Sequence, residues 1–264
     1  MKARINGFEL AYHLDGPSDA PPDAPVVTFC HSLAADSGMW DEQMPALKHR
    51  RVLRLDMRGH GASAAPPGPY TLRQLAADVV AAWDHLGIAR SDFVGLSIGG
   101  MIGQALGFDH GARVSSLMLC DTRCLSDASQ AKIWEDRIAL VRQAGSLEPV
   151  IDGTIPRWFS EDFVAQAPKR TEEVRQMMRR CSVEGYAGCG RAISVFDFSA
   201  ELPKIKAPTM IVVGREDAGA TVADAQAIQR GIAGSQLRII EKCRHLPNIE
   251  DPTAFNAIMS NWLQ

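Results

Sequence analysis

A turn of glycines and one serine, GLSIGG at residues 95–100, joins a strand-like run to a helix-like run. Residues 93–96 are short and apolar, and residues 98–108 have helical spacing with many small side chains. Such a turn holds its serine in a strained backbone conformation, and larger neighbours than glycine would collide with the adjoining strand and helix. The motif therefore predicts a serine hydroxyl exposed at the carboxyl end of a sheet.

Strand-like and helix-like segments alternate on both sides of this turn, which predicts an α/β fold with a mostly parallel central sheet and helices on both faces. From residue 122 to about 199 the pattern changes to helical spacing with many charges and no convincing strand. We expect residues 1–122 and 200–264 to form the core and residues 123–199 a helical cap inserted above it. The predicted strands are residues 8–12, 26–30, 51–56, 93–96, 114–120, 210–214 and 237–240, and the main predicted core helices are 39–48, 71–86, 98–108 and 253–263.

The composition is that of an ordinary globular protein, with 46% hydrophobic and 22% charged residues in a chain of 264. A formal charge of −3 gives no basic footprint for nucleic acid, and no apolar stretch has the length of a membrane span. The first residues lack the apolar core of a secretory signal, so we expect a cytoplasmic protein. The six cysteines form no CxxC pair and no zinc-like spacing, so no metal is expected. The sequence leaves open whether the chain is a monomer or a homo-oligomer.

A serine hydroxyl becomes a strong nucleophile when a nearby base takes its proton. In folds with this turn, the nucleophile, acid and histidine follow one another in that order along the chain. Ser97 is therefore predicted as the nucleophile and His245, in the loop after a late strand, as the base. Asp217, just after the strand 210–214, is the predicted acid, and Asp121 at the end of the strand 114–120 is its serious rival. Glu216 is a weaker rival because we expect it to be solvated.

Two backbone N–H groups are needed to bind the oxyanion that forms during acyl transfer. One is predicted from Ile98, the residue after the nucleophile. The other is predicted from Leu33, in the loop after the strand 26–30. His31 and Ser32 either support this loop or form a purely structural turn.

Several stretches together resemble the 3-oxoadipate enol-lactonases of the α/β-hydrolase superfamily. They include RVLRLDMRGHGASAAPPGP at 51–69, GLSIGGMIGQALG at 95–107, the cap segment WEDRI at 134–138 and HLPNIE at 245–250. The resemblance covers most of the chain and is weakest in the middle of the cap. Three positions depart from the family pattern, namely His31 and Asp121, where asparagine is frequent, and the residues that follow Asp217.

The resemblance implies an enol-lactone substrate that carries a carboxylate, cleaved through an acyl-enzyme with no metal and no organic cofactor. A substrate carboxylate requires a nearby cation, for which Arg58, Arg123 and Arg137 are the candidates. Arg58 also fits a structural role in its loop. Trp134 is expected to pack the cap or to form a wall of the substrate site.

Two other functions remain open from the sequence. A general carboxylesterase or perhydrolase would use the same three catalytic residues on neutral esters. A non-catalytic binding module would keep the fold, although a complete set of serine, aspartate and histidine argues against it. A halide-releasing enzyme would need a carboxylate nucleophile at residue 97, and the glycines do not form a phosphate-binding motif.

Overall fold

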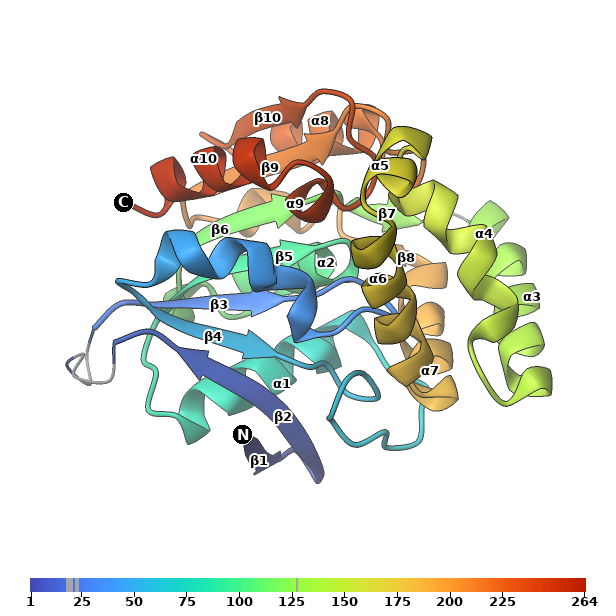
Figure 1. Ribbon diagram of the computed structural model, residues 1–264. Helices are drawn as coiled ribbons and strands as arrows, with labels where there is room; N and C mark the ends of the chain where they lie inside the picture. The colour runs from blue at the N-terminus through green and yellow to red at the C-terminus, as the bar shows by residue number, and fades with distance from the viewer. Residues whose placement is uncertain (18–20, 22–23, 127) are drawn as a thin grey trace.

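One large sheet of eight strands forms the centre of the protein (Figure 1). The computed structural model describes residues 1–17, 21, 24–126 and 128–264. The strands are β1 (Lys2–Ile5), β2 (Phe8–Asp15), β3 (Val26–Cys30), β4 (Arg51–Leu55), β5 (Ser91–Leu96), β6 (Val114–Cys120), β9 (Thr209–Gly214) and β10 (Gln236–Ile240). They lie in the order β1-β2-β4-β3-β5-β6-β9-β10. β2 is antiparallel to β1 and β4, and the other neighbours are parallel.

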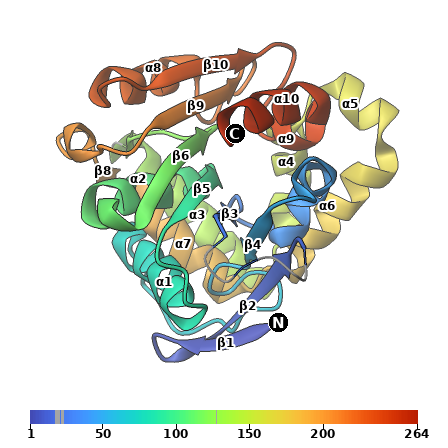
Figure 2. The same cartoon turned by 90° about the vertical axis from the view of Figure 1, so that its left-hand side faces the viewer.

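Helices cover both faces of this sheet, which confirms the predicted α/β fold. Figure 2 shows α1, α2 and α8 on one side of the sheet and α9 and α10 on the other. The core helices are η1 (Ser37–Leu47), α1 (Leu72–His85), α2 (Ile98–Asp109), η2 (Gly111–Arg113), η3 (Leu202–Lys204), α8 (Val222–Gly231), α9 (Pro247–Glu250) and α10 (Pro252–Trp262). The described residues contain no helix with the length and apolar character of a membrane span.

The central strands are buried on both faces, which explains why they are continuous apolar runs rather than alternating ones. Every residue of β3 and of β9 is buried. The parallel register brings the carboxyl ends of neighbouring strands to one edge of the sheet. Cys30 at the end of β3 pairs with Gly95 of β5. Leu96 at the end of β5 pairs with Cys120 of β6, so the loops that follow these strands emerge side by side.

Helix α1 shows how local signals set an element's limits. The Thr71 side chain accepts a hydrogen bond from the Gln74 N–H and caps the first turn. Gly87 follows the helix with a φ of 66°, a conformation that glycine adopts without strain. The helix predicted at 39–48 is instead the 3-10 helix η1, which contains Pro45 and its missing N–H. The edge strand β1 was not predicted.

Among the described residues between β6 and β9, five α-helices form a group that we call the cap, and it extends beyond the carboxyl edge of the sheet (Figure 1). They are α3 (Ala128–Ala144), α4 (Glu148–Trp158), α5 (Glu161–Gln166), α6 (Pro168–Arg180) and α7 (Val183–Ser194). The expectation that this region has no strand is wrong at its two ends. β7 (Leu125–Ser126) and β8 (Phe196–Asp197) pair there in antiparallel fashion. Two residues are too short a segment to show a period in the sequence.

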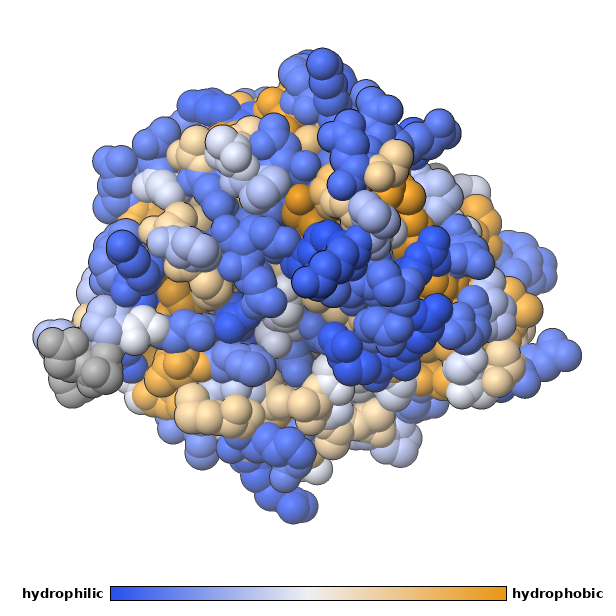
Figure 3. All heavy atoms as spheres, viewed as in Figure 1, coloured by the Kyte–Doolittle hydropathy of each residue, from blue (hydrophilic) through white to orange (hydrophobic). Residues whose placement is uncertain are grey.

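The surface seen in Figure 3 is mostly hydrophilic, with hydrophobic residues scattered between the polar ones. Among the described large hydrophobic residues, the most exposed include Ile133 and Leu140 of α3, and Val195 just after α7. Scattered exposed hydrophobic side chains are ordinary on a globular protein.

A close backbone contact joins the cap to the core. The Ser182 N–H donates to the Gly59 carbonyl over 2.9 Å, just before α7 begins. A Cβ atom on Gly185 would lie 2.4 Å from the Gly59 carbonyl oxygen. Only a residue without a side chain fits at that distance. The first glycine of the RGHG loop, Gly59, is therefore explained by the approach of α7. A Cβ on the second glycine, Gly61, would instead lie 2.3 Å from the Asp56 carboxylate.

We predict that Gly185→Ala lowers the free energy of unfolding by about 1–3 kcal/mol, because its methyl group forces the cap away from the core. Gly153→Ala in α4 is the matched control, since a Cβ there meets no atom within 4 Å. The control should be neutral or stabilising by up to about 1 kcal/mol. Urea unfolding of both variants measures the difference, and equal stabilities would contradict the prediction.

Candidate active site

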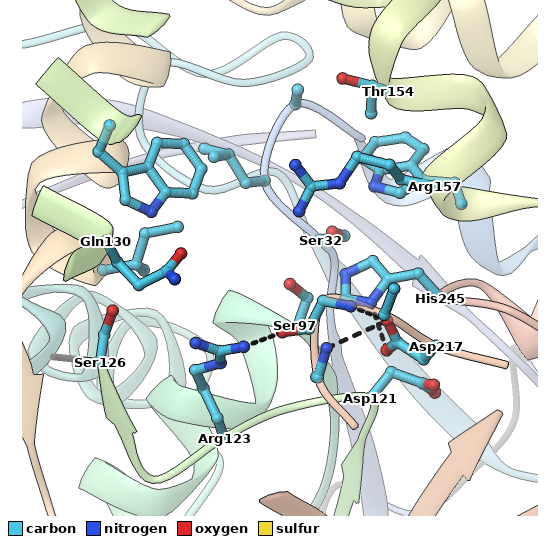
Figure 4. Close-up of a pocket in the computed structure, with 18 of the residues that line it drawn as sticks. Ser32, Ser97, Asp121, Arg123, Ser126, Gln130, Thr154, Arg157, Asp217 and His245 are labelled. Carbon is cyan, nitrogen blue, oxygen red and sulfur yellow. Dashed lines mark hydrogen bonds and ion pairs between the residues drawn. The ribbon is translucent and has the colours of Figure 1, made fainter. Parts of the chain in front are cut away.

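A pocket of about 320 Å³ lies between the carboxyl edge of the sheet and the cap (Figure 4). Loops of the core form its floor, and side chains of α3, α4, α6 and α7 form its walls. The loops after the strands contribute, among others, Ser32, Leu33, Ala34, Ser97, Asp121, Arg123, Asp217 and His245. The cap helices contribute, among others, Gln130, Trp134, Arg137, Thr154, Arg157, Trp158, Met178 and Tyr186.

Ser97 stands in the predicted strained turn between β5 and α2. Its φ of 59° and ψ of −116° are unusual for any residue with a side chain. A Cβ on Gly95 would lie 2.2 Å from the Gly99 carbonyl oxygen. A Cβ on Gly99 would lie 2.3 Å from the Cys30 carbonyl oxygen. Glycine at both positions therefore lets the turn pack closely enough to leave Ser97 partly exposed in the pocket.

His245 and Asp217 form a hydrogen-bonded pair beside this serine. Nδ1 of His245 lies 2.7 Å from Oδ2 of Asp217, and the Asp217 side chain has no exposed surface. The indole of Trp158 stacks on the His245 ring, with 6.5 Å between the ring centres. With Nδ1 bonded to the carboxylate, Nε2 is the ring nitrogen that remains for a proton from another group. Among the described residues, Ser97 Oγ makes no hydrogen bond.

Backbone N–H groups of the loop that carries Asp217 donate hydrogen bonds to its carboxylate. Oδ1 accepts from the Gly219 N–H at 2.7 Å and from the Ala220 N–H at 3.1 Å. Burial alone would raise the pKa of Asp217, but His245 and these N–H groups outweigh burial and lower it below its ordinary value. The guanidinium of Arg123 in turn donates to the Gly219 carbonyl. The carboxylate is therefore held ionised and fixed in place.

Asp121, the rival acid, lies beside Asp217, but Asp217 is the carboxylate that accepts the hydrogen bond from His245. Oδ1 of Asp121 accepts from the Gly214 N–H at 2.8 Å. Burial and the neighbouring Asp217 raise the pKa of Asp121 well above its ordinary value. Glu216 lies outside the pocket, with its nearest cation 4.0 Å away on Arg244.

The loop after β3 is held by a buried histidine. Nδ1 of His31 lies 2.8 Å from the Ser32 carbonyl, and Nε2 accepts from the Met57 N–H at 2.9 Å. His31 is fully buried, and desolvation lowers its pKa, so the ring stays neutral with its proton on Nδ1. Ala34 has a φ of 65°, a strained value for alanine. In the described chain, the Leu33 and Ile98 N–H groups have no hydrogen-bond acceptor and are available to a ligand.

Arg58, a candidate for binding a substrate carboxylate, lies outside the pocket, in the structural role that its loop also allowed. Its guanidinium forms two hydrogen bonds of 2.6 Å with Asp78, and both side chains are almost fully buried. The rings of Phe8 and Tyr70 lie against it, 4.7 and 5.1 Å from their centres. Arg58 does not line the pocket. Packing from distant parts of the chain decided this placement.

Arg137 and Arg157 are the two cap arginines at the pocket. Within the described residues, neither has a carboxylate within 4.0 Å, and Arg137 lies over the Trp134 ring. Arg157 is exposed as a whole, but its guanidinium is directed into the pocket (Figure 4). Desolvation there, followed by repulsion from Arg137, lowers the pKa of Arg157.

Sequence reasoning did not predict Arg157, although a signal was present. Thr154, Arg157 and Trp158 have the i, i+3, i+4 spacing of one helix face, and all three line the pocket. An i, i+4, i+7 spacing on α3 likewise brings Gln130, Trp134 and Arg137 to the pocket from the opposite wall.

One group of potential metal ligands occurs among the described residues, and it coincides with the site. Asp121, Asp217 and His245 each offer an atom, and these atoms lie within 4.8 Å of one another. An ion bound to His245 through Nδ1 would have to replace the 2.7 Å hydrogen bond to Asp217. The geometry therefore fits an acid–base pair better than a metal centre.

Comparison with known proteins assigns the class of the protein. Residues 29–258 match the model of the Alpha/beta hydrolase family. The chain belongs to this family and is an α/β-hydrolase enzyme, as the sequence motifs predicted.

The similarity to enol-lactonases is also confirmed. The chain is 35% identical to 3-oxoadipate enol-lactonase 2 of Acinetobacter baylyi, a match covering 89% of this chain and 86% of that protein. The enol-lactonase from Burkholderia xenovorans LB400, whose crystal structure is known, is 37% identical to this chain in sequence. The two structures match with a TM-score of 0.94 over 100% of this chain and 99% of that chain. A thermophilic esterase from Thermogutta terrifontis, solved with malate bound, is 29% identical to this chain. Its structure matches with a TM-score of 0.91 over 100% of this chain and 98% of that chain.

His60 makes the stability of the site region sensitive to acid. Its ring lies 5.1 Å from that of His31, and burial followed by repulsion from His31 lowers its pKa from 6.5 to about 3. At a pH between about 3 and 6.5, His60 is therefore protonated in the unfolded chain and neutral in the folded chain.

We predict that the free energy of unfolding falls by about 2 kcal/mol between pH 7 and pH 5 through His60 alone, because the unfolded state gains the proton. Urea unfolding at both pH values measures the loss. His60→Gln should show a shallower decline than the wild type, whereas His49→Gln, at an exposed histidine, should not. The same decline in all three proteins would contradict this assignment.

Proposed function

We propose that this protein is a serine hydrolase that cleaves a carboxylic ester or lactone through an acyl-enzyme, with 3-oxoadipate enol-lactonase-like specificity. The observation that carries the proposal is the 2.7 Å bond between His245 and the buried Asp217, next to Ser97 in a strained turn. The relatives named enol-lactonase support the lactone substrate. We also propose that residues 123–199 act as a cap that sets specificity.

In the proposed mechanism, Ser97 Oγ attacks the lactone carbonyl carbon while its proton passes to Nε2 of His245. The N–H groups of Leu33 and Ile98 stabilise the oxyanion. The bond between the carbonyl carbon and the ring oxygen then breaks, and the ring oxygen takes the proton from His245 to leave as an enol. Water then attacks the acyl carbon, with His245 again accepting the proton. The bond between the acyl carbon and Ser97 Oγ breaks, and Oγ takes the proton from His245, which restores the serine hydroxyl and releases the acid product. Asp217 orients the imidazole and stabilises its charged form.

We predict that Ser97→Ala lowers kcat by at least about 10⁴-fold without unfolding the protein, because the nucleophile is lost. Ser126→Ala is the matched control, since this pocket serine already donates to the Ser194 carbonyl. Quenched mass spectrometry with a slowly hydrolysed ester should detect an acyl adduct on the wild type and on Ser126→Ala only. Undiminished turnover by Ser97→Ala would refute the proposal.

The cap arginines support a substrate that carries a carboxylate. Arg137 and Arg157 place two positive charges at one pocket, and the pKa of Arg157 is lowered by desolvation and by Arg137. A carboxylate between them would relieve this repulsion through charge-assisted hydrogen bonds. The malate bound in the esterase relative is itself a carboxylate ligand. Arg123 is less suited to this role because it holds the Gly219 carbonyl.

We predict that Arg157→Met raises KM for 3-oxoadipate enol-lactone by about 10- to 100-fold, because a hydrogen bond to a charged group is lost. The same variant should leave kcat/KM for p-nitrophenyl acetate, a neutral ester, within about threefold. Arg191→Met is the matched control, an exposed arginine of α7 outside the pocket. Equal losses on both substrates would show that Arg157 does not recognise a carboxylate.

A general carboxylesterase is the second candidate, favoured by the similarity to the Thermogutta esterase. It shares the proposed catalytic residues and differs in the charge of its substrate. A higher kcat/KM for neutral esters than for the enol-lactone would favour it. The complete set of Ser97, Asp217 and His245 argues against a non-catalytic binding module.

A further inference from the structure

Two buried carboxyl groups lie together beside the His245 ring, and the proposed mechanism uses only one of them. Asp121 follows β6, Asp217 follows β9, and these strands are neighbours in the sheet. One atom from each carboxyl group and one from the imidazole lie within 4.8 Å of one another. Asp121 has no exposed surface and lies next to Asp217 at the base of the pocket (Figure 4).

The hydrogen bonds of Asp121 are incomplete for an ionised group. Oδ1 accepts from the Gly214 N–H, whereas the buried Oδ2 has no partner among the described residues. An unpaired carboxylate oxygen in a buried site is costly, and carrying a proton would turn this oxygen into a donor. The adjacent carboxylate of Asp217 is an acceptor with lone pairs beyond those already used.

The groups around Asp121 also oppose its ionisation. The acidic groups facing it are Asp217 and Glu250, and the thiols of Cys120 and Cys243, whose pKa values are raised by burial, are neutral neighbours that offer no positive charge. In the described part of the chain, His245 is the only basic group in this cluster, and its Nδ1 is bonded to Asp217.

Two adjacent buried carboxyl groups beside one imidazole do not both ionise, because the second negative charge would be repelled by the first in a dry site. The contrasting pKa shifts agree, since burial and Asp217 raise the pKa of Asp121 while His245 lowers that of Asp217.

We propose that Asp121 is a neutral carboxylic acid whose Oδ2–H donates a hydrogen bond to the catalytic carboxylate of Asp217. This inference rests on the proposed function, because it assigns Asp121 as a positioning residue for that acid. Through Oδ1 the same side chain holds the Gly214 N–H at the end of β9. Asp121 thus connects the strand to the carboxylate that follows it, without adding a second negative charge next to His245.

Asp121→Asn is the decisive variant, because an amide keeps both the acceptor for Gly214 and a donor for Asp217. We expect kcat/KM for the enol-lactone within about threefold of wild type and an unchanged acid limb of its pH profile. If Asp121 were ionised, removing its charge beside the imidazole would move that limb to lower pH by more than about one pH unit. A shift of that size would overturn the proposal.

Asp121→Ala removes the donor and the acceptor together. We expect kcat to fall by about 10- to 100-fold with KM little changed. The conservative variant Asp121→Asn should not show this loss of kcat. Infrared spectroscopy of the folded wild type tests the protonation directly, even if Asp121→Ala does not fold. A carbonyl band of a neutral carboxylic acid should be present at pH 7, vanish in Asp121→Asn and persist in Asp152→Asn, at an exposed aspartate. Absence of that band in the wild type would refute the inference.

Ser97→Ala, measured in the same enol-lactone assay, separates this inference from the proposed function. Full activity of that variant would refute the serine mechanism itself. An inactive Ser97→Ala together with a shifted acid limb in Asp121→Asn would refute only the neutral state of Asp121.

Discussion

The strained backbone at Ser97 is the constraint on which the rest of the site depends. A residue with φ of 59° between a buried strand and a helix persists only when the surrounding packing holds it there. The Ser97 N–H donates to the Cys120 carbonyl over 2.9 Å, and the Thr122 hydroxyl donates to the Ser97 carbonyl over 2.7 Å. Glycine at 95 and 99 allows the close approach of the neighbouring backbone. The same contacts that force the turn therefore align it with the loops after β3 and β6.

Charge is divided between the two sides of the pocket. On the floor, a single ionised carboxylate, Asp217, faces His245, and the proposed neutral state of Asp121 keeps a second charge away. On the cap side, Arg137 and Arg157 supply positive charge without a carboxylate partner in the described chain. This arrangement separates the proposed proton transfers from the proposed recognition of an anionic group, so each can change without disturbing the other.

Core and cap contribute in different ways because they are built differently. The proposed nucleophile, base, acid and oxyanion donors all follow parallel strands of one sheet, whose hydrogen-bonded register fixes their relative positions. The cap side chains project from separate helices that meet the core through contacts such as Gly59 against Gly185. Relatives with the same fold include enol-lactonases and an esterase, as expected if specificity lies mainly in the cap.

The sequence alone determined the sheet strands other than β1, the strained serine turn and the two ends of helix α1. It also determined the chain order of Ser97, Asp217 and His245. The strands, the serine turn and the limits of α1 depend on residues close together in the chain, such as glycines flanking a serine or an apolar run between turns. The order of the three proposed catalytic residues follows from which strand each one comes after. The tertiary structure decided that Arg58 is buried against Asp78 and that Arg157 reaches the pocket. It also decided which aspartate contacts His245. These outcomes depend on contacts between residues far apart in sequence, and burial, charge and hydrogen bonding there follow from the packed fold.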